Sequence, residues 1–172
     1  LPMPEPGEGQ VLLRMRACSV NASDVELVTG RPVYARLFGL TRPRFHVLGS
    51  DVAGVVEAVG PGASRFAVGD AVFGDVFESF GGFAEYAAVP EDRLIAKHDA
   101  LDFATAAALP QAGVIALQAL RSVGPGARVL VNGAGGGMGS FAVQIAKARG
   151  AHVTAVDSAG KAGLLRGLGA DR

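Results

Sequence analysis

The sequence predicts an α/β-plus-β fold, in which a small β-barrel or sandwich precedes the first part of a doubly wound parallel sheet. Short strand-like segments separated by close turns fill residues 1–100, and alanine-rich segments of helical period begin at about residue 101. A strand, a glycine-rich turn, a helix and a second strand then follow over 129–156. The expected domains are therefore 1–100 and 101–172.

The first expected elements are a strand and a short helix. Every second residue from 11 to 17 is apolar, which is the alternation of a half-exposed strand. A helix is expected to begin at about Ser23, because Ser23 and Glu26 have the spacing of a capping box, and Gly30 is a typical helix end. The stretch 31–46 that follows is irregular and carries several arginines.

Short strands bounded by glycine, proline or aspartate are expected next. They cover residues 52–59, 71–73, 83–89 and 93–97. Such strands at close intervals favour a small barrel or sandwich. From residue 101 the apolar residues recur with a helical period, through 102–109 and, beyond Pro110, through 112–121. We therefore place the domain boundary near residue 100.

Composition argues against several classes of protein. Hydrophobic residues make up 49% and charged residues 19% of the chain, which predicts a well-buried core rather than disorder. The formal net charge is zero, which argues against nucleic acid or an anionic membrane as the main partner. No apolar run reaches the ~20 residues of a membrane span and no basic leader precedes one, so a cytoplasmic location is expected. Cys18, the only cysteine, excludes an internal disulfide and a multi-cysteine metal site.

The most informative segment is the glycine turn that follows the strand at 129–131. In the dinucleotide fingerprint the first, third and sixth positions are glycine, and here they are Ala134, Gly136 and Gly139. A small residue suffices for the first tight turn, Gly136 would admit the pyrophosphate, and Gly139 would let the helix pack closely. The alternative is a glycine-rich structural loop. The residues expected to bind a nucleotide cofactor here are Gly133, Ala134, Gly135, Gly136, Gly137, Met138 and Gly139.

An acid follows the second strand of this unit. Asp157 stands 18 positions after Gly139, close to the roughly 20 expected for a residue that hydrogen-bonds an adenosine ribose. Its carboxylate would favour NADH by repelling the extra phosphate of NADPH. Ser158 and Lys161 argue for NADPH, since a hydroxyl and an ammonium there could bind a 2′-phosphate. Lys161 has the alternative of a solvated charge on a short helix.

Five motifs occur in the order typical of one family. They are Asn21-Ala22-Ser23-Asp24, Leu48-Gly49-Ser50-Asp51-Val52-Ala53-Gly54-Val55-Val56, Val68-Gly69-Asp70, Gly82-Phe83-Ala84-Glu85-Tyr86, and the glycine turn with its Ala142-Val143-Gln144-Ile145-Ala146-Lys147 continuation. On these motifs the sequence resembles the medium-chain dehydrogenase/reductase superfamily and, within it, the zinc-free quinone oxidoreductase branch. The resemblance covers essentially the whole chain.

The resemblance implies a GroES-like β-barrel catalytic domain over 1–100, without its first strand, and the N-terminal part of a Rossmann domain over 101–172. It implies an oxidoreductase that transfers a hydride from NADPH or NADH to a quinone or an α,β-unsaturated carbonyl. Quinone reductases of this branch usually use NADPH, so NADPH is favoured here. A homodimer is implied for the complete protein. Family members are longer, so this segment by itself is expected to be inactive.

The resemblance also bears on metals and on the cofactor. Asn21, Ser50 and Gln111 stand where zinc-dependent relatives have their ligands, and none of the three is a good zinc ligand. No zinc is therefore expected, and without a metal to polarise an alcohol, reduction of quinones and enones is favoured. Ile115 stands where a threonine near the nicotinamide is common, and Gln111 is expected to replace that cofactor contact.

Three residues are candidates for the chemistry. By resemblance, Asn21 and Asp24 line the nicotinamide cleft, where the Asn21 amide would orient the substrate carbonyl. The alternative is that Asn21, Ser23 and Asp24 only begin a helix. Tyr34 is a candidate proton donor to the reduced substrate, and solvent is the alternative donor.

Other functions remain open at this level. One is a non-catalytic nucleotide-binding protein, in which a cofactor binds and no hydride is transferred. Another is an enoyl-reductase module within a larger synthase, since such modules share this architecture. A third is that the segment acts as a partner for a longer relative, with the sheet edge at 153–156 covered by another chain.

Overall fold

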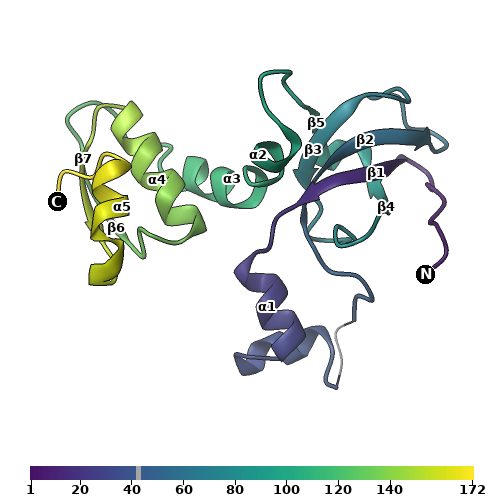
Figure 1. Ribbon diagram of the computed structural model, residues 1–172, viewed down its shortest axis with the longest axis horizontal. Coiled ribbons are helices and arrows are strands. Elements are labelled where there is room, and N and C mark those ends of the chain that lie inside the picture. Colours follow the sequence, from purple (N-terminus) through teal and green to yellow (C-terminus); the bar gives the residue numbers. More distant parts are fainter. Residues whose placement is uncertain (42–43) are drawn as a thin grey trace. The chain divides into compact units, whose positions relative to one another are not determined.

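Five strands of the N-terminal part form one sheet, which runs from purple to teal in Figure 1. The structure is a computed structural model that describes residues 1–41 and 44–172, so residues 42–43 of the expected irregular stretch lie outside the described residues. The chain divides into two units, Leu1–Pro110 and Gln111–Arg172.

The sheet of the first unit is antiparallel throughout. Its strands are β1 (Gln10–Cys18), β2 (Asp51–Val59), β3 (Ala71–Asp75), β4 (Tyr86–Pro90) and β5 (Leu94–Ala96). They lie in the order β4-β1-β2-β3-β5, and every neighbouring pair is antiparallel. The β-rich first part that the sequence predicts is therefore confirmed.

β1 is more buried than its alternating sequence predicts. Residues 11–13 are at most 4% exposed, so the expectation of a half-exposed strand is wrong at this end. The main core lies on one face of the sheet and consists of Val11, Leu13, Val52, Val56, Val72, Val76, Ala87, Val89 and Leu94. On the other face, Ala53 and Phe73 pack against the short helix α2 (Phe103–Ala107). On that second face the helix covers Ala53 and Phe73, which would otherwise be exposed to solvent.

α2 belongs to the first unit. Its N-cap is Asp102, whose Oδ1 accepts a 2.6 Å hydrogen bond from the Thr105 amide, and the helix packs on β1, β2 and β3. The division between the units accordingly lies after Pro110. The functional domain boundary near residue 100 stays a prediction.

The helix α1 (Ala22–Thr29) begins at a different cap from the expected one. Asn21 is the N-cap, and its backbone amide donates to Asp24 Oδ2 at 2.8 Å. The sequence prediction of a Ser23–Glu26 capping box is therefore wrong, because the helix starts two residues earlier. Gly30 ends α1 in the left-handed conformation, with φ +62°, as predicted. A 3-10 helix, η1 (Val33–Phe38), lies within the stretch expected to be irregular.

The second unit contains the strand–helix–strand arrangement that the sequence predicts. β6 (Arg128–Asn132) and β7 (His152–Val156) are parallel, and α4 (Gly137–Ala148) connects them. The helices α3 (Pro110–Ala119) and α5 (Ala162–Gly167) complete the unit. Its core consists of Ala116, Leu120, Val131, Ala134, Ala142, Val143, Ala146, Ala151, Val153 and Leu165. Among the described residues, no helix is long and apolar enough to cross a membrane.

The last residues lie beside β7. The Arg172 carbonyl accepts from the Ala155 amide at 2.7 Å, and the Arg172 amide is 3.3 Å from the Val153 carbonyl. This is the bonding pattern of a parallel strand pair. The Asp171 side chain reinforces it, because Oδ2 accepts from the Val153 amide at 2.6 Å and lies 2.8 Å from Lys147 Nζ. The edge of β7 is therefore partly paired within the chain itself.

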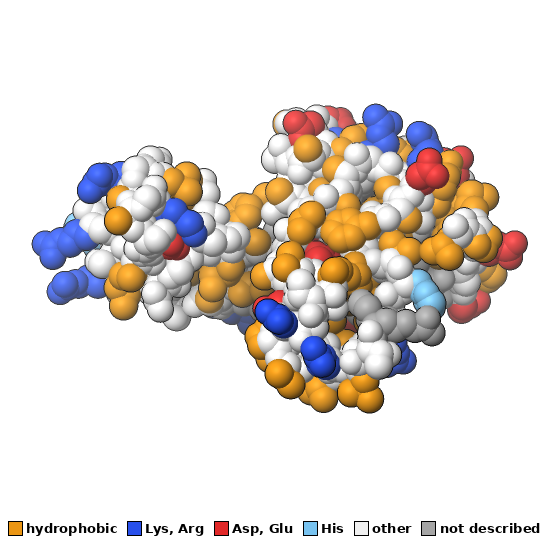
Figure 2. All heavy atoms as spheres, turned by 60° about the horizontal axis from the view of Figure 1, so that its bottom comes forward, with side chains coloured by type: hydrophobic (Ala, Val, Ile, Leu, Met, Phe, Trp, Pro, Cys, Tyr) orange, Lys and Arg blue, Asp and Glu red, His pale blue; other side chains and the backbone are white. Residues whose placement is uncertain are grey.

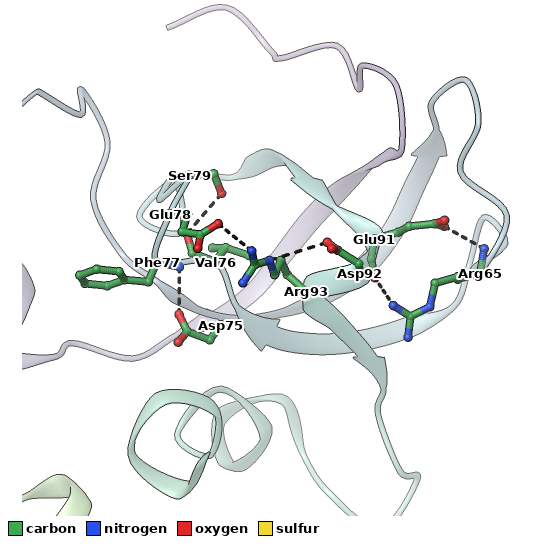
Figure 3. A network of polar contacts seen from close by, with 9 residues as sticks. All are labelled: Arg65, Asp75, Val76, Phe77, Glu78, Ser79, Glu91, Asp92 and Arg93. Atoms are coloured by element: carbon green, nitrogen blue, oxygen red, sulfur yellow. Dashed lines mark hydrogen bonds and ion pairs between the residues drawn. The ribbon is translucent and has the colours of Figure 1, made fainter. Parts of the chain in front are cut away.

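Figure 3 shows a polar network at the end of β3. Arg93 Nη2 lies 2.6 Å from Glu78 Oε2, and the Phe77 amide donates to Asp75 Oδ1 at 2.9 Å. Burial raises the pKa of the Asp75 carboxyl, although that hydrogen bond opposes it. Glu78 and Arg93 are exposed. The network thus fixes a surface turn and does not enclose a site.

Candidate functional site

The glycine turn lies between β6 and α4 and depends on two glycines for its shape. Gly133 has φ +74°, a left-handed conformation that side chains rarely adopt. A Cβ on Gly139 would collide with the Gly133 carbonyl oxygen and lie 2.7 Å from Ala134 Cα. The first turn of α4 therefore packs directly on the loop, as the spacing of the fingerprint predicts for Gly139. Ala134 is fully buried beneath it.

Several backbone amides of this turn already bond to the protein. Gly133 and Ala134 both donate to the Val156 carbonyl, at 2.9 and 3.1 Å, and Gly136 donates to the Gly133 carbonyl at 3.0 Å. These bonds tie the turn to the end of β7. The backbone amides of Gly133, Ala134 and Gly136, three of the residues predicted to contact the cofactor, are therefore not free to donate to it.

Asp157 accepts a fourth amide of the turn. Its Oδ2 accepts from the Gly135 amide at 2.8 Å, and its Oδ1 accepts from the Ser158 amide at 2.7 Å and lies 3.2 Å from Lys161 Nζ. The side chain is only 12% exposed. The bonds from Ser158 and Gly135, and then Lys161, lower the pKa of the Asp157 carboxyl to about 2. Asp157, Ser158 and Lys161 therefore form one cluster with the turn.

The free donors lie at the start of α4. Among the residues that the structure describes, no acceptor bonds the amides of Gly137, Met138 and Gly139, which form the first turn of this 12-residue helix. Free amides at a helix N-terminus carry the positive end of the helix dipole and form an anion-binding site. The free backbone amides of the turn thus cover only part of the predicted 133–139, and their binding of a cofactor stays a prediction.

Gln111 lies near the glycine turn. It is in the first turn of α3, and a Cβ on Gly137 would make ordinary contact, 3.7 Å, with Cβ of the adjacent residue Ala112. The start of α3 therefore approaches the start of α4 within the second unit. The cofactor contact of Gln111 stays a prediction.

Asn21 is held in a polar cluster at the start of β2 in the first unit. Its Nδ2 donates to Asp51 Oδ2 at 3.1 Å and lies 3.4 Å from the hydroxyls of Ser50 and Ser19. Ser50 is completely buried and Asp51 is 1% exposed. The structure thus brings together Asn21 and Ser50, two of the residues that stand at the zinc-ligand positions of the resembled relatives.

Asp24 lies behind Asn21. It is 2% exposed, its Oδ1 accepts from the Gly49 backbone amide at 3.0 Å, and its Oδ2 accepts from the Asn21 backbone amide. A carboxylate that is buried with both oxygens bonded to backbone amides has no open face for a substrate. Its geometry fits positioning of Asn21 and of the 49–50 backbone, so a direct catalytic role for Asp24 stays a prediction that the geometry does not favour.

Tyr34 belongs to η1 and is 54% exposed. Its hydroxyl donates to Glu26 Oε2 at 2.7 Å, and this bond raises the pKa of the Tyr34 phenol. Among the described residues, the hydrogen-bond partner of the Tyr34 side chain is Glu26, which lies outside the Asn21 cluster. The structure therefore does not bring the three predicted catalytic residues into one group.

A small apolar cavity beside Tyr34 is absent from the sequence-based prediction. It measures about 80 Å³ and is lined by Ser23, Glu26, Leu27, Tyr34, Ala35, Phe38, Phe77 and Phe80. The Ser23 hydroxyl oxygen is buried and has no hydrogen-bond partner within the described part of the chain. No local pattern marks this cavity, because it joins α1 to a turn about fifty residues away in sequence.

Metal-binding residues do not gather at either site. No group of three histidine, cysteine or acidic residues within 1–41 and 44–172 could hold a metal ion. Burial, together with Asp24 and Asp51, raises the pKa of the Cys18 thiol to about 12, which opposes formation of a thiolate ligand. The independence from zinc stays a prediction.

Curated relatives match almost the entire chain. A chloroplast envelope quinone oxidoreductase homolog of Arabidopsis thaliana is 37% identical over 182 residues, covering 99% of this chain and 54% of the relative. A 2-methylene-furan-3-one reductase of Solanum lycopersicum is 39% identical over 181 residues, covering 98% and 45%. The polyketide synthase GfsB of Streptomyces halstedii is 40% identical over 167 residues, covering 95% and 3%. The chain spans about half the length of the first two relatives or less.

Solved structures give the same similarity. The quinone oxidoreductase of Coxiella burnetii has a TM-score of 0.87 at 34% identity, covering 99% of this chain and 55% of that one. The Escherichia coli quinone oxidoreductase complexed with NADPH has a TM-score of 0.84 at 27% identity, covering 99% and 51%.

The family profile of the alcohol dehydrogenase GroES-like domain matches residues 7–99, more than half of the chain. This match covers the antiparallel sheet and the Asn21 cluster, and the parallel strands of the second unit begin a Rossmann fold. The chain therefore belongs to the medium-chain dehydrogenase/reductase superfamily, in its quinone oxidoreductase-like branch.

Proposed function

We propose that the protein containing this chain is an NAD(P)H-dependent oxidoreductase that transfers a hydride to a quinone or an α,β-unsaturated carbonyl. The observation that carries the proposal is the start of α4, where the amides of Gly137, Met138 and Gly139 are free among the described residues. Three adjacent donors at a helix N-terminus fit a pyrophosphate. The names of the quinone reductase and enone reductase relatives support the same chemistry.

The glycine turn is the proposed cofactor site. The three free amides would bind the pyrophosphate, while Asp157 would hold the shape of the turn through the Gly135 amide. When bound, the reduced nicotinamide supplies a hydride to the substrate. The protein's own part is to hold the cofactor and to orient the acceptor carbonyl, and Asn21 is the residue proposed for that orientation.

NADPH is the proposed cofactor. Two backbone amides and the Lys161 ammonium compensate the charge of Asp157, so its repulsion of a 2′-phosphate is weakened. Lys161 is nearly half exposed and could turn from Asp157 to that phosphate. The NADPH complex of the similar Escherichia coli enzyme supports this choice.

Reduction without zinc is the proposed chemistry. The Asn21 Nδ2 lies 3.4 Å from the Ser50 hydroxyl, and neutral amide and hydroxyl groups are poor zinc ligands. The proton that completes reduction comes from Tyr34 or from solvent, and Tyr34→Phe distinguishes them. Loss of the pH dependence of turnover in that variant assigns the proton to Tyr34.

A homodimer in the cytoplasm is also part of the proposal. Its oligomeric state is tested by molecular mass in solution, and its location by imaging a tagged protein.

Stopped-flow absorbance with the full-length protein tests the function. We expect NADPH oxidation to accelerate when 1,4-benzoquinone or 3-buten-2-one is added, and little oxidation without either acceptor. Cofactor binding is measured in parallel by fluorescence. Binding without turnover above the uncatalysed rate would assign the protein to the non-catalytic nucleotide-binding class.

An enoyl-reductase module of a larger synthase is the second candidate. The match to a short part of the polyketide synthase GfsB favours it. The chemistry would be the same, but the acceptor would be an enoyl thioester on a carrier. Saturation of a crotonyl thioester at a much higher kcat/KM than benzoquinone would favour the module.

A further inference from the structure

An exposed face that combines apolar and basic side chains lies on η1 and the residues around it. We name it the arginine–leucine face, and it consists of Arg31, Val33, Arg36, Leu37, Leu40 and Arg44. Its apolar members Val33, Leu37 and Leu40 are 80%, 84% and 81% exposed. Figure 2 shows apolar and basic side chains together on the lobe formed by α1 and η1. Large apolar side chains exposed this far mark an interaction surface.

The local charge of this region differs from that of the whole chain. Residues 27–50 contain four arginines and neither aspartate nor glutamate, although the chain has 16 basic and 16 acidic residues in all. Among the described residues, no carboxylate pairs with Arg31, Arg36 or Arg44. The net charge of the whole chain, which argues against an anionic membrane, is therefore zero although this one face is basic.

We propose that the arginine–leucine face docks on an anionic phospholipid surface. Val33, Leu37 and Leu40 protrude and would insert at the boundary between headgroups and acyl chains, while the arginines would contact lipid phosphates. A shallow hollow of about 330 Å³ lies beside them, with Thr29, Arg36 and Leu40 on its walls, and offers room for a headgroup. The proposal goes beyond the oxidoreductase function and does not rest on it.

The partner is lipid rather than protein because of shape and charge together. Val33, Leu37 and Leu40 are each at least 80% exposed, and of these three only Leu40 lines the shallow hollow. The arginines on the same face have no carboxylate partner among the described residues and complement a surface of phosphate groups. Basic and apolar contacts of this kind reinforce each other, since neither alone binds a bilayer strongly.

Vesicle co-sedimentation with the full-length protein tests the proposal. The vesicles are pure phosphatidylcholine or contain about 30 mol% phosphatidylserine. We expect binding only to the anionic vesicles, and its loss when salt rises from about 0.1 M to about 1 M. Leu37→Ser combined with Leu40→Ser should reduce the partition coefficient at least about tenfold, and so should Arg31→Gln combined with Arg44→Gln.

Matched variants on other surfaces control for general changes in polarity and charge. Val68→Ser with Ile95→Ser replaces exposed apolar residues elsewhere in the first unit, and Arg121→Gln with Arg128→Gln removes the same charge from the second. Both should bind the vesicles within about twofold of the original protein. Thermal melting checks that every variant is folded.

Three outcomes would overturn the proposal. The first is no binding of the original protein to anionic vesicles. The second is equal loss of binding in the control variants, which would make the attraction nonspecific. The third is a fall in molecular mass in the Leu37→Ser/Leu40→Ser variant without any effect on vesicle binding, which would assign the face to a second copy of the chain.

Discussion

Asp157 forms more bonds to its own chain than a ribose-binding acid requires. Its two oxygens accept the Gly135 and Ser158 amides and one lies 3.2 Å from Lys161 Nζ. The carboxylate thus fixes the turn and holds the lysine at the same time. Loosening the turn affects NADH and NADPH alike, because both have the same pyrophosphate. The ratio of their affinities therefore reports the contacts at the 2′ position of the adenosine ribose and not those of the pyrophosphate.

Asp157→Asn should shift cofactor preference further toward NADPH. The variant removes a negative charge beside the proposed 2′-phosphate position and releases Lys161, so the KM ratio of NADH to NADPH should rise by up to about tenfold. Steady-state kinetics with both cofactors measures it. Lys161→Met is the opposing variant and should weaken NADPH binding only. An unchanged ratio in both variants would contradict the assignment of this cluster to the adenosine ribose.

Gly139→Ala should destabilise the second unit and prevent cofactor binding. The added methyl group would collide with the Gly133 carbonyl oxygen and lie 2.7 Å from Ala134 Cα, so α4 must move away from the turn, at a cost of about 1–3 kcal/mol. Gly137→Ala is the matched control, since its Cβ meets only Ala112 Cβ at 3.7 Å. Urea unfolding compares the two variants. Equal stability of both would show that close packing at Gly139 is not required.

At the scale of elements, the start of α1 depends on a contact across the chain. Asp24 joins the helix N-terminus to the Gly49 amide, 25 residues away. Asp24→Ala should lower the free energy of unfolding by about 1–3 kcal/mol, because the buried Gly49 amide and the half-buried Asn21 backbone amide lose their acceptor. Glu26→Ala is the control, since the Glu26 side chain bonds only the exposed Tyr34 hydroxyl among the described residues, and should cost less than about 1 kcal/mol. A larger effect of Glu26→Ala would restore the capping box that the sequence predicts.

Local signals explain which elements the sequence predicts well. The glycine turn and the Gly30 helix end are defined by residues within a few positions, and both are found as predicted. The sequence offers two capping-box pairs for α1, Asn21 with Asp24 and Ser23 with Glu26, because each acid follows a possible cap residue by three positions. The structure uses Asp24, which also accepts from the Gly49 amide, and this distant contact is not visible in the local sequence. Burial of Ala53 and Phe73 on the second face of the sheet likewise depends on α2, which is distant from them in sequence.

The ion pair between Lys147 of α4 and Asp171 should make the free energy of unfolding depend on pH. Lys147, with the Val153 amide, lowers the pKa of the Asp171 carboxyl from 3.8 to about 2. A lowered folded pKa means that Asp171 contributes stability above pH ~4 and loses it as the pH falls toward about 2. Asp171→Asn should therefore be less stable than the original protein at pH 6 but not at pH 2, as measured by urea unfolding. Glu5→Gln, at an exposed residue, should show no such difference.

At the scale of the whole molecule, the two units differ in how much of a sheet each contains. Among the described residues, the first unit has five strands with packing on both faces, and the second has two strands. Leu130 of β6 is 68% exposed, so one face of that small sheet is open. A two-stranded sheet with an open face has few of the contacts that give a sheet independent stability.

Hydrogen exchange on residues 1–172, expressed without further sequence, should therefore divide the chain into two levels of protection. The amides of β1 and β2 should exchange only by global unfolding of the first unit, whereas those of β6 and β7 should exchange at least about tenfold faster through local opening. The same preparation should oxidise NADPH no faster than buffer, because the open unit holds the start of α4 less rigidly. The bonds from Asp171 and Arg172 to β7 act against this opening, so Asp171→Asn should increase exchange in β7 and leave β1 unchanged. Equal protection in the two units, with robust NADPH oxidation, would show that two strands suffice for an ordered cofactor site.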